Sequence, residues 1–306
     1  MRILFFGSSG FSVPALQSID SFVSCVVTRR AKPKGRGYLM EDGEVKRLAQ
    51  KLNLPLVEMD SFKDAEAHDL VAMKPDLLVV VSFGLIIPRW FLDVPSLGAI
   101  NVHPSLLPKY RGPAPIQWVI RNGDIETGIT VIKMNERMDA GDILYQESVR
   151  VGTGENAETL SARLAQRTAE LLPGVMKGIE TGGLLSGLAQ KDEEATYTPM
   201  IVKEMGLVDW ATDPVDIVRQ VRAFVAWPTA FTFLNGKLFK VFDADLGRKT
   251  AEADPGTVLE VMADGLLVSA LGGSVLLKDV QLENRKRMSA SEFARGYRGI
   301  VGKKFA

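Results

Sequence analysis

The sequence predicts an α/β protein: a doubly wound, mainly parallel, Rossmann-like sheet with a second, small β-barrel domain of the OB-like type. Strand patterns alternate with helix patterns through the first part of the chain, which is typical of a parallel sheet. One run, DLLVVVS at 76–82, is apolar without interruption, as expected of a strand with both faces covered. From Val208 onward, short strand patterns follow one another with hairpin turns between them, which favours a small antiparallel barrel.

The alternating elements can be followed along the first part of the chain. Short apolar runs predict the strands, and apolar residues three or four positions apart predict the helices. In one expected helix Ser61 is the predicted N-cap, with Asp64 three residues later. The strands are expected at residues 2–6, 22–28, 54–57, 76–82 and 99–102, and the helices at residues 13–19, 43–52 and 61–73.

Two more strands, a long helix and a linker are expected next. The strands are predicted at residues 128–134 and 142–151, with a polar loop between them. The helix is predicted at residues 157–179, and Pro173 within it predicts a kink or an end. Residues 191–203 show little periodicity and are interpreted as a linker.

The remaining chain predicts a small domain rich in β-strands. Dipeptides typical of two-residue hairpin turns, Asn235-Gly236 and Asp264-Gly265 among them, separate its apolar runs. We therefore expect a catalytic domain over residues 1–203 and a barrel over residues 207–306. In the second domain a helix is expected at residues 214–224, and strands at residues 231–234, 237–242, 256–261, 266–270 and 274–282.

The composition is that of an ordinary globular protein and excludes several classes. Of the 306 residues 46% are hydrophobic, and the 37 basic and 37 acidic residues balance, so net charge does not argue for nucleic acid. No window of about 18 apolar residues occurs, and Gly7 interrupts the N-terminal apolar run, so we expect neither a membrane span nor a signal peptide. A cytoplasmic location is expected by default. The single cysteine, Cys25, excludes an internal disulfide and is expected to be a buried thiol.

The loop after the first expected strand lacks a dinucleotide fingerprint. It reads Gly7-Ser8-Ser9-Gly10, with a serine where the second glycine of the motif is required. No acidic residue stands about 20 positions further on to bind a ribose. A Walker A motif is also missing from the sequence, so neither oxidoreductase nor nucleotide hydrolase function is supported.

The candidate chemistry follows the last of the early strands. His103 comes directly after that strand, and the carboxyl ends of parallel strands are where such sheets place active sites. Asn101 is two residues earlier, so both side chains point the same way in an extended chain. The polar loop NERMDAGD offers Asp139 and Asp142 to orient the imidazole or accept a proton, and the residues alone do not decide between them. No second histidine or cysteine stands at ligand spacing, so no metal is expected.

This pattern resembles the folate-dependent formyltransferase family. The segment NVHPSLLPKYRG, followed by MDAGD, carries the resemblance, and the essential asparagine, histidine and aspartate of the family fall on Asn101, His103 and Asp139. The resemblance implies transfer of a formyl group from 10-formyltetrahydrofolate, as a co-substrate, to an amine. It also implies a folate site formed by Phe83, Gly84, Leu85, Ile87, Ser105, Leu106, Leu107 and Pro108.

Further segments resemble those members of the family that formylate the methionine of initiator Met-tRNA. They include GRGYLMEDGEVKRLAQKLNLPL, RGPAPIQWVIRNGDIETGIT and VQLENRKRMSASEFARG, and they extend the likeness over nearly the full length. The likeness implies initiator Met-tRNA and folate as partners, with no obligatory protein partner. It also implies tRNA contacts from two basic segments, through Lys34, Arg36, Arg285, Lys286 and Arg287.

Two other functions share part of this pattern. A formyltransferase acting on an amino-sugar nucleotide would have the same three residues and could carry a barrel-like second domain. A nucleotide sugar needs only a few cations, whereas the two concentrated basic segments suit a polyanion such as tRNA. A catalytically silent nucleic-acid-binding protein is the third alternative, and the intact set of Asn101, His103 and Asp139 argues against it.

Overall fold

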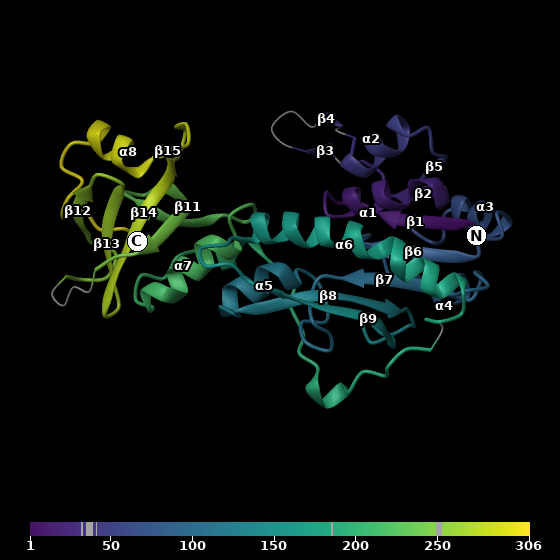
Figure 1. Ribbon diagram of the computed structural model, residues 1–306. Helices are drawn as coiled ribbons and strands as arrows, with labels where there is room; N and C mark the ends of the chain where they lie inside the picture. The colour runs from purple at the N-terminus through teal and green to yellow at the C-terminus, as the bar shows by residue number, and fades with distance from the viewer. Residues whose placement is uncertain (32, 35–38, 41, 185, 249–252) are drawn as a thin grey trace. The chain divides into compact units, whose positions relative to one another are not determined.

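The computed structural model describes residues 1–306 except 32, 35–38, 41, 185 and 249–252 (Figure 1). The chain forms two compact units, each with its own hydrophobic core. The first unit contains Met1–Gly112, Glu126–Arg150 and Ser161–Thr198, and the second contains Pro113–Ile125, Val151–Leu160 and Pro199–Ala306. Two short segments that precede residue 161 therefore belong to the second unit.

The first unit is built on a seven-stranded sheet in the order β5-β2-β1-β6-β7-β8-β9. The strands from β5 to β7 are parallel, whereas β8 and β9 are antiparallel to their neighbours. The chain builds β2 and β5 on one side of β1 and β6 and β7 on the other, which confirms the predicted doubly wound, mainly parallel sheet. The bounds are β1 Ile3–Gly7, β2 Val23–Thr28, β5 Leu56–Glu58, β6 Leu77–Val81, β7 Ala99–His103, β8 Glu126–Lys133 and β9 Ile143–Arg150.

The central strands are buried on both faces. Every residue of β1 and of β6 is buried, which is why these two sequences show no alternation of apolar and polar residues. Aromatic side chains fill the space over this part of the sheet. Phe6 lies edge-on to Phe83 and to Phe91, with ring centroids 5.1 Å and 5.9 Å apart. This core fixes the start of the loop that follows β6.

The three helices predicted before residue 80 are present, one of them with a corrected start, and the short helix α4 was not predicted. The helix expected from residue 61 begins only at Ala65, and its N-cap is Asp64 rather than Ser61. The Asp64 carboxylate accepts the backbone N–H groups of Asp60 and Ser61, which holds this stretch in a turn before the helix. The bounds are α1 Ser12–Ile19, α2 Glu44–Lys51, α3 Ala65–Ala72 and α4 Arg89–Leu92, and a two-stranded sheet pairs β3 Pro33–Lys34 with β4 Leu39–Met40.

Helix α6, Ala157–Glu180, continues through Pro173, so of the kink or end predicted at that proline, the end is wrong. A proline inside a helix costs about 3 kcal/mol because one hydrogen bond is lost and the ring is crowded. The adjacent turns bury Leu171, Leu172, Val175 and Met176. Burial of side chains of this size contributes about 1.5–3 kcal/mol each, which offsets the cost.

In the part of the chain that the structure describes, no helix has the length and apolar character of a membrane span.

The second unit contains an antiparallel sheet, as predicted for the C-terminal domain, with a sixth strand, β15, in addition to the five expected. Residues 303–306 pair with both edges of this sheet, because Lys304 bridges to Thr257 and Phe305 bridges to Leu234. The last residues thus link the two edges of the sheet to each other. The strands are β10 Ala230–Leu234, β11 Lys237–Leu246, β12 Val258–Met262, β13 Gly265–Ala270, β14 Gly273–Leu282 and β15 Met288–Ser289, and the helices are α5 Pro115–Asn122, α7 Pro214–Ala223 and α8 Ala290–Gly296.

Cys25 lies on β2 with no exposed surface, as expected for a buried thiol. Burial raises the pKa of its thiol to about 11. Because the thiolate is the reactive form, we expect native protein at pH 8 to react with a thiol reagent such as DTNB far more slowly than denatured protein. Labelling at the same rate in buffer and in guanidinium chloride would contradict the buried position.

Candidate active site

The candidate site is built at the carboxyl end of β7. Asn101 and His103 are two residues apart on this strand, so their side chains leave the same face of the sheet. Asn101 is half-buried, and His103 is only 5% exposed. The strand is held between parallel β6 and antiparallel β8, which makes the position of both side chains rigid.

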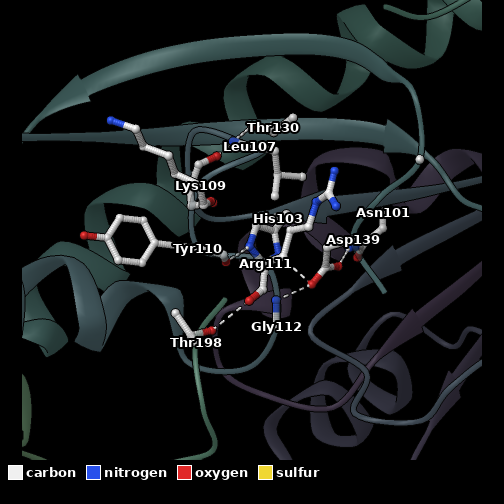
Figure 2. A network of polar contacts seen from close by, with 12 residues as sticks. Asn101, His103, Leu107, Lys109, Tyr110, Arg111, Gly112, Thr130, Asp139 and Thr198 are labelled. Carbon is white, nitrogen blue, oxygen red and sulfur yellow. Dashed lines mark hydrogen bonds and ion pairs between the residues drawn. The ribbon is translucent and has the colours of Figure 1, made fainter. Parts of the chain in front are cut away.

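Asp139 completes the group, and Asp142 does not. The Asp139 carboxylate accepts the Asn101 side-chain amide at 3.2 Å through Oδ1 and the Gly112 backbone N–H at 2.8 Å through Oδ2. Its Oδ2 also lies 3.7 Å from His103 Nδ1 (Figure 2). Asp142 is exposed, and no contact joins it to these residues in the described parts of the chain. The structure therefore brings Asp139, and not Asp142, next to Asn101 and His103.

The tautomer of His103 follows from its second contact. The ring Nε2 is 2.9 Å from the backbone carbonyl oxygen of Tyr110, and a carbonyl only accepts, so Nε2 carries the proton. In the neutral ring Nδ1 then presents a lone pair toward the Asp139 carboxylate. Nδ1 of the neutral ring and the carboxylate oxygen are both hydrogen-bond acceptors. A bound group that carries a proton can therefore donate to them. The pair is therefore arranged to receive a proton from a bound donor such as an amine.

The turn after His103 is stabilised by hydroxyl groups. Ser105 is fully buried, and its Oγ donates to the Lys109 carbonyl at 2.7 Å. Thr130 Oγ1 on β8 donates to the Ser105 carbonyl at 2.6 Å and accepts the Leu107 N–H at 3.1 Å. Gln146 on β9 donates to the Leu107 carbonyl at 2.8 Å. Ser105 and Leu107, both in the predicted folate site, therefore lie inside this turn, while Leu106 and Pro108 are half-buried beside it.

The loop after β6 contains the other predicted folate residues, and they divide into two kinds. Phe83 and Ile87 are buried in the core of the first unit, and Leu85 is half-buried against it. Gly84 is exposed, and no atom lies within 4 Å of the place that a Cβ would take. Ile86 was not predicted, although its side chain is 79% exposed. An alternating pattern through residues 83–87 was the available signal, because it sends Ile86 to the side opposite its neighbours.

The basic residues predicted to contact tRNA have different surroundings. Arg36 lies outside the described residues, and of Lys34 only the backbone, in β3, is described. Arg285 and Lys286 are exposed between β14 and β15, with no side-chain partner in the described chain. Arg287 pairs with Asp279 at 2.6 Å and lies 4.1 Å from the centre of the Phe242 ring.

Three consecutive residues that were not predicted from the sequence also shape the site. The Tyr110 carbonyl fixes the His103 tautomer, and the Gly112 N–H holds the Asp139 carboxylate. Arg111 between them is fully buried, which is unusual for an arginine. Two of these contacts are made by backbone atoms, for which the sequence offers no signal beyond the glycine. Gly112 has a φ of +104°, a conformation that L-residues rarely adopt.

Comparison with known proteins gives matches over nearly the whole chain. Residues 1–176 match the family described as formyl transferase, and residues 200–298 match the formyl transferase C-terminal domain. A methionyl-tRNA formyltransferase of Geobacter sulfurreducens is 41% identical over 302 residues, which are 97% of this chain and 94% of that relative.

Two solved structures share the fold. HypX from Aquifex aeolicus, in complex with tetrahydrofolic acid, is 19% identical, with a TM-score of 0.66 over 96% of this chain and 46% of that one. An N-formyltransferase from Helicobacter canadensis, in complex with folinic acid and dTDP-3-aminofucose, is 16% identical, with a TM-score of 0.68 over 91% of this chain and 99% of that one. At these identities the likeness concerns the fold alone.

Proposed function

The chain belongs to the formyl transferase family, and we propose that it transfers the formyl group of 10-formyltetrahydrofolate to the α-amine of methionine on initiator Met-tRNA. The product is formylmethionyl-tRNA, which serves translation initiation. One observation carries the proposal: Asn101, His103 and Asp139 converge in a chain whose full-length relatives are methionyl-tRNA formyltransferases.

The first step needs an uncharged amine and a proton acceptor. A free α-amine has a pKa of roughly 7.7–8.0, so part of it is neutral at neutral pH. The amine nitrogen attacks the formyl carbon, a carbon–nitrogen bond forms, and the nitrogen becomes positively charged. His103 Nδ1 accepts the proton that this nitrogen must lose, and Asp139 Oδ2, 3.7 Å from Nδ1, stabilises the charge that the ring gains.

The tetrahedral intermediate carries a negative oxygen, which Asn101 stabilises. The Asn101 amide has two N–H groups and uses one of them on Asp139 at 3.2 Å, so the other is available to the oxyanion. The N–H of His103 Nε2 is directed at the Tyr110 carbonyl. A donor from His103 is therefore Nδ1–H, which exists only after the ring has taken the proton of the amine.

The intermediate collapses when the leaving nitrogen of the folate receives a proton. Protonated His103 supplies it from Nδ1 while the bond between that nitrogen and the formyl carbon breaks, and the ring returns to its neutral form. The proton lost by the amine is thus the proton gained by the leaving group. The Asp139 carboxylate stabilises the imidazolium between the two transfers.

We propose that the folate lies against the loops after β6 and β7. Exposed Gly84 leaves room for a ligand because no atom lies within 4 Å of its Cβ position, and exposed Ile86 offers an apolar surface next to it. Leu85, Leu106 and Pro108 are half-buried and complete the contact surface that we propose. The remaining predicted residues support these loops from inside, and they are Phe83, Ile87, Ser105 and Leu107.

We propose that residues 207–306 form the tRNA-binding domain. We also propose that Lys34 and Arg36, in the basic segment near the N-terminus, contact the tRNA. Exposed Arg285 and Lys286 have no side-chain ion pair in the described chain, so both charges are available to phosphates. Arg287 forms an ion pair with Asp279, so of these three cations it is the weaker candidate for a phosphate contact. The observation that supports this domain is the match of residues 200–298 to the C-terminal domain of the family.

The double variant Arg285→Ala/Lys286→Ala is expected to weaken Met-tRNA binding and to leave folate binding unchanged. Removing a cation that neutralises a phosphate lowers the salt dependence of binding by about one unit of slope, so the slope of log K against log salt should fall by about 1–2. Filter binding of Met-tRNA at several salt concentrations measures it.

A charge-matched control is Arg222→Ala/Lys278→Ala. Arg222 pairs with Asp245 at 2.7 Å, and Lys278 pairs with Asp245 at 3.0 Å and with Asp243 at 3.7 Å. The control therefore also removes two positive charges, but charges that two carboxylates already neutralise. We expect a smaller loss of tRNA affinity from it. Equal losses from the two double variants would mean that only net charge matters, and that the 285–286 turn makes no specific contact.

The proposed function is tested with purified protein, 10-formyltetrahydrofolate and Met-tRNA. The aminoacyl ester is hydrolysed after the reaction, and formylmethionine is measured by mass spectrometry. We expect formylmethionine to depend on the protein and on the formyl donor. Formation no faster than in a protein-free control would contradict the proposal.

A further inference from the structure

Residues 188–198, interpreted largely as a linker from the sequence, are hydrogen-bonded to the active-site segments at both ends. Leu188 and Ile143 exchange two backbone hydrogen bonds, at 2.8 Å and 2.9 Å, just after the loop that carries the catalytic carboxylate. At the other end, the Thr198 N–H donates to the Arg111 carbonyl at 2.8 Å. Both contacts lie within the first unit. The segment therefore lies along the catalytic loop and is attached before and after it.

Gln190 is the residue of this segment that holds the catalytic loop. Its Nε2 donates to the backbone carbonyls of Asp139 and Gly141, at 2.9 Å and 2.7 Å. Its Oε1 accepts from Arg111 twice, from Nε at 3.0 Å and from Nη2 at 2.8 Å. All the donors and acceptors of the amide are therefore in use. The buried Arg111 guanidinium fixes Gln190, and Gln190 fixes the loop.

Asp192 holds the same loop from another side. Its carboxylate pairs with Arg111 Nη1 at 2.9 Å and with Arg137 Nη2 at 2.6 Å. These two guanidinium groups hold the pKa of Asp192 below its usual range, so it remains ionised at neutral pH. Arg137 is two residues before Asp139 in the chain.

The catalytic loop needs such support. Asp139 has a φ of +49°, in the left-handed region that L-residues other than glycine seldom occupy. A backbone in this region persists only where surrounding contacts over-determine it. The contacts of Gln190 to the carbonyls of Asp139 and Gly141 lie on either side of Ala140. They therefore fix the backbone from which the Asp139 carboxylate projects toward His103.

We propose that Gln190 is a positioning residue for formyl transfer, and that the clamp formed by Arg111, Gln190 and Asp192 holds the Asp139 carboxylate at its working distance from His103. The inference rests on the proposed function, in which Asp139 serves the chemistry. The clamp thus gives a positioning role to Gln190 and Asp192, which lie in the segment after helix α6.

The test uses two variants of the full-length protein. Gln190→Ala removes the amide, whereas Gln190→Glu keeps the size and the pairing with Arg111 but replaces the two N–H donors by an acceptor oxygen. A displacement of about 1 Å in a reacting group can cost on the order of 10² in rate, so we expect kcat to fall by at least about 10-fold in both. The side chain at position 190 is not proposed to touch a substrate. The KM for the folate and the KM for Met-tRNA should therefore change by less than about 2-fold in either variant.

The matched control is Gln220→Ala. Gln220 Nε2 also donates to two backbone carbonyls, those of Met205 and Leu207 at 2.7 Å and 2.9 Å, but in the second unit. We expect this variant to keep the parental kcat. A loss of kcat in Gln220→Ala equal to that in the Gln190 variants would reduce the effect to general loss of structure and would overturn the proposal.

Hydrogen exchange gives a reading that does not depend on activity. Amides of residues 135–142 should exchange faster in both Gln190 variants than in the parent and in Gln220→Ala. A parent that formylates no Met-tRNA contradicts the proposed function alone. An active parent whose kcat and loop exchange are matched by Gln190→Glu contradicts the clamp.

Discussion

Asp139→Asn is expected to lower the turnover number for Met-tRNA formylation by about 10²–10⁴, the range associated with a positioned proton acceptor. The amide keeps the size of the side chain and can still accept the Gly112 N–H, so the protein should fold. It cannot take a proton or stabilise the His103 imidazolium at 3.7 Å. Steady-state kinetics with both substrates varied would show the loss in kcat rather than in KM.

The control for this prediction is Asp142→Asn in the same loop. Asp142 is exposed and is not joined to His103 in the described chain, so its loss should change kcat only a few-fold. Asn101→Ala removes an oxyanion donor and is expected to cost about 10²–10³. His103→Ala removes the proton carrier and should cost at least as much as Asp139→Asn. The assignment of the carboxylate is wrong if Asp142→Asn proves more damaging than Asp139→Asn.

Among substitutions that add a single methyl group to the site, Gly141→Ala is expected to lower activity the most. The new Cβ would lie 1.8 Å from the Lys133 carbonyl oxygen, a distance that no relaxation of a flexible side chain can relieve. The loop that carries Asp139 two residues earlier must therefore move. A shift of about 1 Å can cost on the order of 10² in rate, and overpacking typically costs about 1–3 kcal/mol of stability.

Circular dichroism melting and formylation kinetics measure the two effects of Gly141→Ala separately. Gly174→Ala is the matched control, because Gly174 lies in α6 with no atom within 4 Å of its Cβ position. There the methyl group should raise stability by about 0.5–1 kcal/mol and leave activity unchanged. A Gly141→Ala protein with parental kcat would show that the loop tolerates displacement, and that the position of Asp139 is not critical.

The sequence predicted the strands best where burial is complete. The residues of β6 are all buried, so their apolar run needs no tertiary information to be recognised. Helix α5 was missed, because Gly112, Pro113 and Pro115 in its approach are typical of a loop, and its N-cap Ala114 has the left-handed φ of +60°. Helix α8 was also missed, although Ser289 and Glu292 form a capping box that the sequence displays.

The candidate active site was predictable only in part, because part of it consists of backbone atoms and of residues distant in the sequence. Asn101 and His103 are close in sequence and share a strand, so alternation alone places them together. The choice of Asp139 over Asp142 depends on a loop whose φ of +49° at Asp139 no sequence pattern indicates. Arg111 and Gln190 are 79 residues apart in sequence, and a fully buried arginine is not expected from composition.

Formyl transfer to Met-tRNA through Asn101, His103 and Asp139 can be tested in a single competition experiment. The most direct measurement offers the protein labelled 10-formyltetrahydrofolate with equal amounts of Met-tRNA and a 4-amino-sugar nucleotide in one reaction. We expect label in the tRNA fraction, released as formylmethionine, and an initial rate about 10²–10⁴ lower when Asp139→Asn replaces the parent. Label in the sugar-nucleotide fraction, with none above background in the tRNA, would contradict it.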